Sequence, residues 1–494
     1  MLKNKYLSIH FFLGILTAIT VPLSVFWINI SPFITPLLGT LYIISFVICL
    51  KKGTEKLGQK IRLIFASMFI LLIAVLGNYC NPYWNSINLK NNASFYSYTP
   101  DTMLTSKEAE KDLEYAMYYL KKLHPAFYSS VPEDVQVRYE SVSEKIKGCE
   151  EISVCELSQD IEYIFSVMRD GHSYVKMNVQ EPHYMKEIYR FNQGGYELRK
   201  VNGITVEELL KQTKDMYSYE VESWQLLNLK GDISSLEGLA YLGFSADDGI
   251  TYTYKSINGD TEEVVCYPDD FLTYDQYYEY NDIETQITEE TPFVYYSIDE
   301  DRNAAILTLN SCNYNDEYSS CLKDMFTEVK EKNIENIAVD LRSNGGGDSR
   351  VADEFIRYLN VEKWRSCGYE WRLGCFKIPF TENEVKNEKY TDLTFYGNTY
   401  ILTSANSFSS AMLFSQYIKD NNLGVIIGEA PGNTPNGYGE ISMFKLPNSQ
   451  LYMQISTKEF LRADQNTSDR LVEPDIACDS DKAVDIFYKT IERN

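Results

Sequence analysis

The stretch NIAVDLRSNGGGDSRVADEFIRYL, residues 336–359, decides the fold of this chain. It opens with a short apolar run that ends at Asp340-Leu341-Arg342, which is typical of a buried strand. Three consecutive glycines at 345–347 then form a turn, and the residues after Ser349 have the apolar spacing of a helix. A strand that leads through a glycine turn into a helix is the repeating unit of an α/β fold.

Further units of the same kind surround this stretch. Strands that alternate with helices predict a mostly parallel sheet covered by helices, so the fold class is expected to be α/β. Ligands of such sheets bind beyond the carboxyl ends of the strands. The remaining predicted elements are strands at 304–310, 399–404 and 425–429, helices at 320–333 and 411–420, and a final hairpin at 441–446 and 451–457.

Composition separates the chain into two kinds of polypeptide. It has 494 residues, of which 44% are hydrophobic and 23% charged, so it can bury a large core. Its formal net charge of −24 argues against a nucleic-acid partner, which would need a basic surface. Residues 1–80 contain seven Lys or Arg and a single acid, whereas the rest of the chain is strongly acidic.

The basic first part is long and apolar enough for membrane helices. Three spans are expected, at about 7–28, 33–50 and 63–76, with a turn at 29–32 between the first two. A cleaved signal peptide is the alternative for the first span. Its length, the lack of a small-residue cleavage site and the apolar segments that follow argue against that alternative.

Lys and Arg residues set the expected orientation because they remain on the cytoplasmic side. Lys3 and Lys5 precede the first span, and the basic segment 51–62 separates the second from the third. Both lie inside only if the turn at 29–32 lies outside, and the third span then exports everything after Cys80. We therefore expect a multi-pass protein of the cell membrane whose acidic body lies outside the cytoplasm.

Five regions are expected along the chain. Apolar residues at helical spacing and Pro125 mark a helical section, and the Asn202-Gly203 and Asn258-Gly259 turns mark a small mixed module. The regions are a transmembrane part with three helices at 1–80, a linker at 81–105, a helical section at 106–189, a small mixed α/β module at 190–290, and the α/β domain at 291–494.

Cysteines and histidines give little sign of a metal site. The ten cysteines include three close pairs that can each close a small loop, although reduced thiols fit equally well. None of the pairs has metal-ligand spacing with a nearby histidine, and the chain has four histidines in all. No metal and no cofactor are therefore expected. The three pairs are Cys149/Cys155, Cys312/Cys321 and Cys367/Cys375.

Two strand ends carry residues suited to chemistry. The glycines at 345–347 can bring backbone N–H groups close to a ligand, and Ser409 stands at the start of a helix, where the helix dipole is positive. Each signal has a structural alternative. A glycine run is often only a tight turn, and a serine at a helix start is often only an N-cap.

The order of five motifs resembles a known family. DGH at 170–172, DLRSNGGG at 340–347, SFSSA at 407–411, IIGE at 426–429 and PDI at 474–476 follow one another as in the C-terminal processing, or tail-specific, serine peptidases, including the core of tricorn protease. The segments KKLHP and RKVNGITVEELL look like the helical cap and middle module of that family. The resemblance covers about 106–475 and implies a catalytic domain of the crotonase and Clp-protease type, and the middle module is expected to be PDZ-like.

The resemblance implies roles for individual residues. Ser409, the middle serine of the 407–411 turn, would be the nucleophile, and the backbone N–H groups of Ser410 and Gly346 would form the oxyanion hole. Many members carry a general-base lysine about two dozen residues after the serine, but the stretch GEAPGNTPNGYGE at 428–440 has none. The tricorn-like branch uses a histidine from the cap, which His172 matches.

The third member of this triad is expected near the PDI motif. Asp469 fits the acidic position of the family better than Glu473, the alternative. A neutral imidazole removes the serine proton, while a carboxylate orients the ring and stabilises its charged form. His124 and the pair Asp340 and Arg342 are interpreted as structural.

The expected function is a membrane-anchored serine endopeptidase that hydrolyses exported or membrane-proximal polypeptides through an acyl-enzyme on Ser409. The alternative is an inactive peptidase-like domain that binds peptides or an apolar ligand, which the missing lysine favours. An acyl-CoA enzyme of the crotonase type is disfavoured because CoA is scarce outside the cytoplasm. The sequence leaves the oligomeric state and the natural substrate open.

Overall fold

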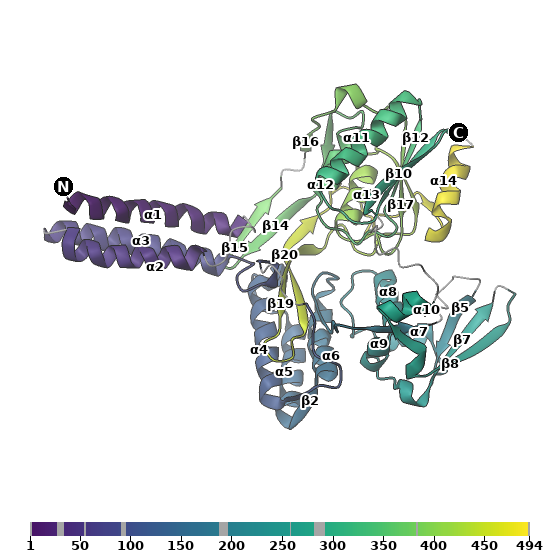
Figure 1. Ribbon diagram of the computed structural model, residues 1–494, viewed down its shortest axis with the longest axis horizontal. Coiled ribbons are helices and arrows are strands. Elements are labelled where there is room, and N and C mark those ends of the chain that lie inside the picture. Colours follow the sequence, from purple (N-terminus) through teal and green to yellow (C-terminus); the bar gives the residue numbers. More distant parts are fainter. Residues whose placement is uncertain are drawn as a thin grey trace.

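The structure, a computed structural model, describes residues 2–26, 34–53, 56–89, 95–186, 196–256, 258–280, 292–381 and 384–492. Figure 1 shows a helical bundle that projects from a folded body of several parts. The predicted turn at 29–32 and the two ends of the small module, at 189/190 and 290/291, lie outside the described residues.

Three N-terminal helices pack side by side (Figure 1): α1 (Leu2–Phe26), α2 (Ile34–Ile48) with a π-helical end (Cys49–Gly53), and α3 (Leu57–Cys80). Two stretches, Ile34–Gly53 and Leu57–Cys80, are long and apolar enough to cross a membrane, by length and composition. The sequence prediction of three spans is wrong in number. The described apolar stretch of α1, Lys5–Val21, is shorter than the roughly 20 residues that a membrane span needs.

A six-stranded sheet forms the centre of the C-terminal domain, in the order β10-β11-β12-β17-β18-β21. All neighbours are parallel except the edge pair β10 and β11. This confirms the α/β class predicted from the 336–359 stretch. The strands are β10 (Val294–Asp299), β11 (Ala304–Leu309), β12 (Asn336–Asp340), β17 (Asn398–Thr403), β18 (Val425–Gly428) and β21 (Ile476–Ala477).

Helices cover both faces of this sheet. One face packs with α11 (Asp316–Glu331), α12 (Arg350–Ile356) and α13 (Ser410–Asp420) in a core rich in Leu, Ile and Phe. The other face is covered by α14 (Ala483–Ile491), whose Phe487 is fully buried. The burial of apolar residues on both faces explains why the strands lack polar alternation.

A second sheet joins the C-terminal domain to the helical cap. Its order is β15-β14-β20-β19, and β3 also pairs with β20. The predicted final hairpin is therefore present, as β19 and β20. These strands belong to the second sheet and not to the central one, and their side chains Phe444, Met453 and Ile455 pack into the core of the cap. The strands are β3 (Tyr174–Lys176), β14 (Gly368–Leu373), β15 (Phe376–Phe380), β19 (Tyr438–Lys445) and β20 (Tyr452–Leu461), and the cap helices are α4 (Ser106–Leu123), α5 (Glu133–Gly148) and α6 (Val154–Phe165).

The small mixed module has an antiparallel sheet in the order β6-β5-β7-β8 and a core of its own. It lies beside the cap and below the central sheet in the view of Figure 1. Its elements are β5 (Tyr196–Val201), β6 (Ile204–Thr205), α7 (Val206–Gln212), α8 (Glu222–Asp232), α9 (Leu236–Tyr241), β7 (Ile250–Ser256) and β8 (Thr261–Cys266).

Shorter elements complete the described chain. The strands β13 (Lys363–Arg365) and β16 (Glu384–Lys386) pair with each other, as do β1 (Met103–Thr105) with β2 (Glu151–Ser153) and β4 (His183–Met185) with β9 (Phe271–Thr273). The helix α10 (Tyr274–Tyr280) follows β9. All ten cysteines are free thiols, so of the two alternatives left open for the three close pairs, the structure has the reduced one.

Candidate active site

Ser409 lies between the end of β17 and the first residue of α13. Its backbone has φ 55° and ψ −119°, a conformation that costs a non-glycine residue of the order of 1–3 kcal/mol and is concentrated at functional sites. The side chain of Asn433 accepts a hydrogen bond from the Ser409 N–H at 2.8 Å. The half-buried hydroxyl is thereby held at the positive end of the α13 dipole.

The neighbouring serines are occupied by the backbone. The Ser407 hydroxyl donates to the carbonyl of Leu341 at 2.8 Å, and the Ser410 hydroxyl donates to the carbonyl of Gly347 at 2.6 Å. Both hydroxyls therefore brace the turn against the glycine loop. The Ser409 hydroxyl has no such bond to any part of the chain that the structure describes, which distinguishes it within the 407–411 motif.

The glycine loop touches the serine turn directly. Gly346 has φ +104°, and a Cβ built there would lie 2.6 Å from the Cβ of Ser409. Only a residue without a side chain fits this contact. The Gly346 N–H donates to Oδ1 of Asn344 at 2.8 Å, so this predicted oxyanion donor is engaged by its own loop. The loop is also held to Cys312, whose N–H donates to the Gly346 carbonyl at 3.0 Å.

His172 reaches the serine turn from the cap, at the junction before β3. Its ring lies against Phe408, the residue before Ser409, with ring centroids 4.5 Å apart. The side chain of Gln454 on β20 donates to the His172 carbonyl at 2.8 Å and fixes this loop to the second sheet. The residue is 6% exposed, and neither ring nitrogen has a hydrogen-bond partner among the described residues. Burial lowers the pKa of His172, and the charge of Asp170 opposes this effect.

Asp170 connects two histidines. Its Oδ1 accepts the backbone N–H of His172 at 2.9 Å and lies 3.8 Å from Nδ1 of the same ring. Its Oδ2 lies 3.2 Å from Nε2 of His124, whose Nδ1 accepts the N–H of Ala126, so Nε2 carries the proton that Asp170 accepts. Burial raises the pKa of Asp170, but the hydrogen bond and charge of His124, the charge of His172 and the hydrogen bond of Ser173 together outweigh burial, and the pKa falls to about 2. A buried carboxylate anion therefore faces the His172 ring.

Glu220 is a second buried acid at this point, and no pattern in the sequence marks it. It lies between α7 and α8, and its Oε2 accepts the N–H and hydroxyl of Thr434 at 2.6 and 2.7 Å. Its Oε1 is buried without a partner among the described atoms. Burial and the charge of Asp170 raise the pKa of Glu220 to about 8, so this carboxyl is mostly protonated at neutral pH.

Asp170, His172 and Glu220 form the polar cluster of the site, with ligand atoms within 4.8 Å of one another. One imidazole and two carboxyls are also a donor set for a divalent cation. Both oxygens of Asp170 are already used by His124 and by the backbone of His172. The arrangement therefore suits proton transfer better than metal binding.

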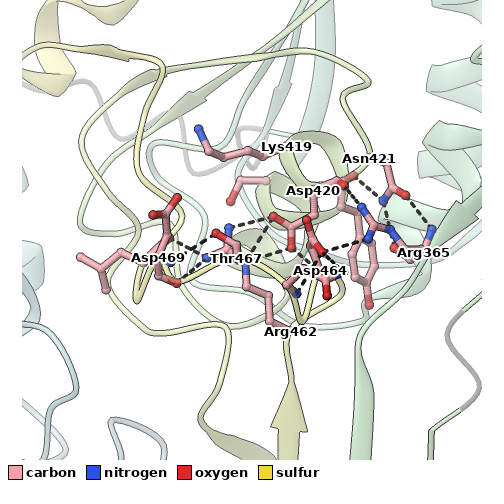
Figure 2. A network of polar contacts seen from close by, with 12 residues as sticks. Arg365, Lys419, Asp420, Asn421, Arg462, Asp464, Thr467 and Asp469 are labelled. Carbon is pink, nitrogen blue, oxygen red and sulfur yellow. Dashed lines mark hydrogen bonds and ion pairs between the residues drawn. The ribbon is translucent and has the colours of Figure 1, made fainter.

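Asp469, the predicted triad acid, lies in a different network. Figure 2 shows it at one end of a chain of polar contacts that extends to Arg365. Its carbonyl accepts a hydrogen bond from the buried Arg462 at 2.8 Å, and Arg462 also pairs with Asp420 at 2.7 Å. Asp420 ends α13, about 16 Å of helix away from Ser409 at 1.5 Å per residue.

No ion pair or hydrogen bond joins Asp469 or Glu473 to His172 within the described chain, and both carboxylates are exposed. The guanidinium of their neighbour Arg470 donates to the Glu220 backbone carbonyl, so the same loop does reach the polar cluster through a side chain. The structure thus brings Ser409, Ser410 and Gly346 together and places His172 against the neighbouring Phe408, whereas no hydrogen bond or ion pair joins Asp469 to any of them within the described chain.

A cavity of about 310 Å³ opens beside the cluster, between the cap and the small module. Gly171 and Trp224 line it, and Trp224 stacks on Phe408 with centroids 4.1 Å apart. Trp224 thus connects the wall of the cavity to Phe408, the residue before Ser409. Several tyrosines and the buried carboxyl of Glu162 form its other walls.

Comparison with known proteins assigns the domain. Residues 303–478 match the family model described as peptidase family S41. Two solved structures of mature CPAF, one of them in complex with lactacystin, share the fold with TM-scores of 0.56 and 0.55. The identities are 13% and 14%, and the matches cover 78% of this chain and 97% and 95% of theirs. No curated protein matches the chain. Residues 303–478 are therefore a domain of peptidase family S41, and through this domain the chain is a serine-type peptidase.

Proposed function

We propose that this peptidase is an endopeptidase, anchored in the membrane, that hydrolyses exported or membrane-proximal polypeptides through an acyl-enzyme on Ser409. One observation carries the choice of nucleophile. Ser409 combines a strained backbone with a hydroxyl that takes no part in the bonds bracing its turn, and it follows the aromatic ring on which His172 rests.

In the proposed reaction His172 is the general base. Its lowered pKa keeps the ring neutral at pH 7, so a ring nitrogen can accept the Ser409 proton as the oxygen attacks the peptide carbonyl. The imidazolium then returns the proton to the leaving amine, and the C–N bond breaks to give the acyl-enzyme. Water, deprotonated by the same ring, hydrolyses the ester and restores the Ser409 hydroxyl.

For the carboxylate of the triad we favour Asp170 over Asp469. Asp170 is anionic and buried, and it lies 3.8 Å from the His172 ring, so it can stabilise the imidazolium in a site of low dielectric. The hydrogen bond that orients the ring would form when the site closes on substrate, since catalytic bonds are often long without it. Asp469 stays a prediction from the sequence without a supporting contact.

For the oxyanion hole we keep the N–H of Ser410 and the glycine loop. Ser410 is the first residue of α13, whose terminal N–H groups have no partner within the helix. Gly346 lies against Ser409, but its N–H would have to exchange Asn344 for the oxyanion. Gly346 and Gly347 both have positive φ, a conformation in which glycine pays little to rotate its peptide unit.

The substrate would be bound between the cap and the central sheet. The cavity lined by Gly171 and Trp224 offers room for a substrate side chain next to the reacting carbonyl. The small module, which we expect to be PDZ-like, borders this cavity through α8 and α9 and would hold the peptide beyond it. The two apolar helices at Ile34–Gly53 and Leu57–Cys80 would supply the membrane anchor.

Hydrolysis of a labelled, unfolded protein by the full chain in detergent tests this proposal. Ser409→Ala and His172→Ala should each lower the rate by a factor of about 10³ or more. Ser319→Ala, which removes an exposed hydroxyl on α11, is the matched control and should keep the wild-type rate. If only Ser409→Ala is inactive, the base lies elsewhere. If the folded wild type binds peptides but cleaves none, the alternative of an inactive binding domain is correct.

A further inference from the structure

Two cysteines that are distant in the sequence meet where the helical bundle joins the body. Cys80 is the last residue of α3, and Cys375 lies in the tight turn between β14 and β15. The side chains of Cys80 and Cys375 interact electrostatically. A Cβ built on Gly374 would lie 3.2 Å from the Cα of Cys80, so the two backbones also approach closely.

Packing holds both partners in place. Cys80 belongs to a small buried cluster with Tyr83, Trp371 and Leu373, which contains residues from both elements. Arg372 on β14 donates to the Lys121 carbonyl at 2.7 Å and to the Gly374 carbonyl at 3.3 Å, and it thereby ties the turn to the cap. The pair therefore results from fixed neighbours and does not depend on freely rotating surface side chains.

The two thiols differ in solvent exposure, and this difference suits the two steps of thiol–disulfide exchange. Cys375 is exposed, whereas Cys80 is 7% exposed. The ammonium of Lys122 interacts electrostatically with the Cys80 sulfur. An accessible thiol can attack an external disulfide, and a neighbouring buried thiol can then resolve the mixed disulfide.

We propose that Cys80 and Cys375 are a thiol–disulfide site that joins α3 covalently to the β14–β15 hairpin. The oxidant is a small-molecule disulfide such as oxidised glutathione. The Cys375 thiolate attacks it, forms a mixed disulfide and releases one thiol. The Cys80 thiolate then attacks the Cys375 sulfur and releases the second thiol. The external disulfide takes up two electrons, and the protons of the two protein thiols pass to the two released thiols.

This pairing differs from the loop predicted from sequence proximity. Cys367 lies just before β14, whereas the turn with Cys375 follows that strand. The Cys367 sulfur contacts the Tyr417 hydroxyl at 3.0 Å, so Cys367 faces α13 and not the turn. The bond from Cys80 to Cys375 would instead fix the end of α3 to the sheet of β14 and β20. The position of Cys80 on the outer side of the membrane, as the orientation predicts, gives the pair access to oxidants.

The test uses the full chain in its own membranes, treated with oxidised glutathione and digested without reduction. Mass spectrometry should find one peptide pair linked through Cys80 and Cys375, which dithiothreitol separates. Cys80→Ser and Cys375→Ser should each abolish this product. The matched control Cys478→Ser, a partly exposed cysteine at the far edge of the central sheet, should retain it.

A second readout counts the remaining thiols with a maleimide mass tag added in SDS. Oxidised wild type should carry two tags fewer than the reduced protein. The proposal is overturned if Cys80 and Cys375 both take the tag after treatment of a folded wild type, or if Cys375 is linked to another cysteine. Neither readout depends on peptidase activity, so the result is independent of the proposed function.

Discussion

The backbone N–H of Ser409 donates to the side-chain oxygen of Asn433 at 2.8 Å. The two residues are 24 positions apart, in the stretch where the resemblance to C-terminal processing peptidases would place a general-base lysine. A carboxamide has no basic nitrogen and cannot take up the serine proton. Asn433 therefore shapes the serine turn, and the base that we propose for Ser409, His172, comes from another part of the chain.

The first prediction concerns the charge of Asp170. Asp170→Asn removes the buried anion beside His172 and should lower kcat/KM by about 10²- to 10⁴-fold. The carboxyl has a folded pKa of about 2 against an ordinary 3.8, which corresponds to about 2 kcal/mol of stability at pH 7. Thermal unfolding should therefore also occur at a lower temperature. A variant with a full rate would exclude Asp170 from the reaction.

The second prediction concerns the pH profile of peptide hydrolysis. Burial lowers the pKa of His172 below its ordinary value of 6.5, so the folded protein holds the proton less tightly than the unfolded chain. The rate should rise with pH through an apparent pKa below 6.5 and stay high at pH 7. The contribution of His172 to the free energy of unfolding is fully present above pH 6.5. It is lost as the pH falls through the lowered pKa, because the unfolded chain takes up the proton more readily. A rate that rises only above pH 8 would instead indicate a different base.

The third prediction concerns Glu220. Its pKa is raised, whereas that of His172 is lowered, so the two groups change stability with pH in opposite directions. Between 4.5 and about 8 the folded protein holds this proton and the unfolded chain does not, so stability falls as the pH rises through that interval. Glu220→Gln should raise the unfolding temperature at pH 8 by a few degrees and change it little at pH 5. The exposed Glu133→Gln is the control and should leave both temperatures unchanged. Equal shifts at both pH values would contradict the assignment.

The fourth prediction compares two neighbouring glycines. A Cβ at position 346 would meet Ser409 at 2.6 Å and the Phe408 carbonyl at 2.8 Å, and the residue has φ +104°. Gly346→Ala should therefore displace the serine turn, lower the unfolding temperature and reduce hydrolysis at least about tenfold. A Cβ at Gly345 meets nothing within 4 Å, so Gly345→Ala should keep near-normal activity. Comparable losses in both variants would mean that the loop as a whole, and not this contact, matters.

The sequence alone determined the class of the fold and the place of the candidate nucleophile, Ser409. Apolar strands, glycine turns and helical spacing are local patterns, and they predict the central sheet and place Ser409 between β17 and α13. The motif order around Ser409 and His172 similarly indicated the family, and the match over 303–478 confirms it. The number of membrane spans was predicted less well. The sequence predicted three, whereas two described helices are long and apolar enough, because the described apolar stretch of α1 is shorter than the apolar run in the sequence.

The tertiary structure decided which groups surround that nucleophile. Glu220 and Trp224 reach the site from the small module, and Asn433 reaches it from the loop after β18. No local pattern marks them, because a side chain acquires its role from the elements packed against it. The same reason explains Asp469. Its spacing to the PDI motif suited a triad, but Arg462 and Asp420 hold its backbone in a network at the opposite end of α13. Sequence spacing limits where a carboxylate can lie, and packing determines where it does lie.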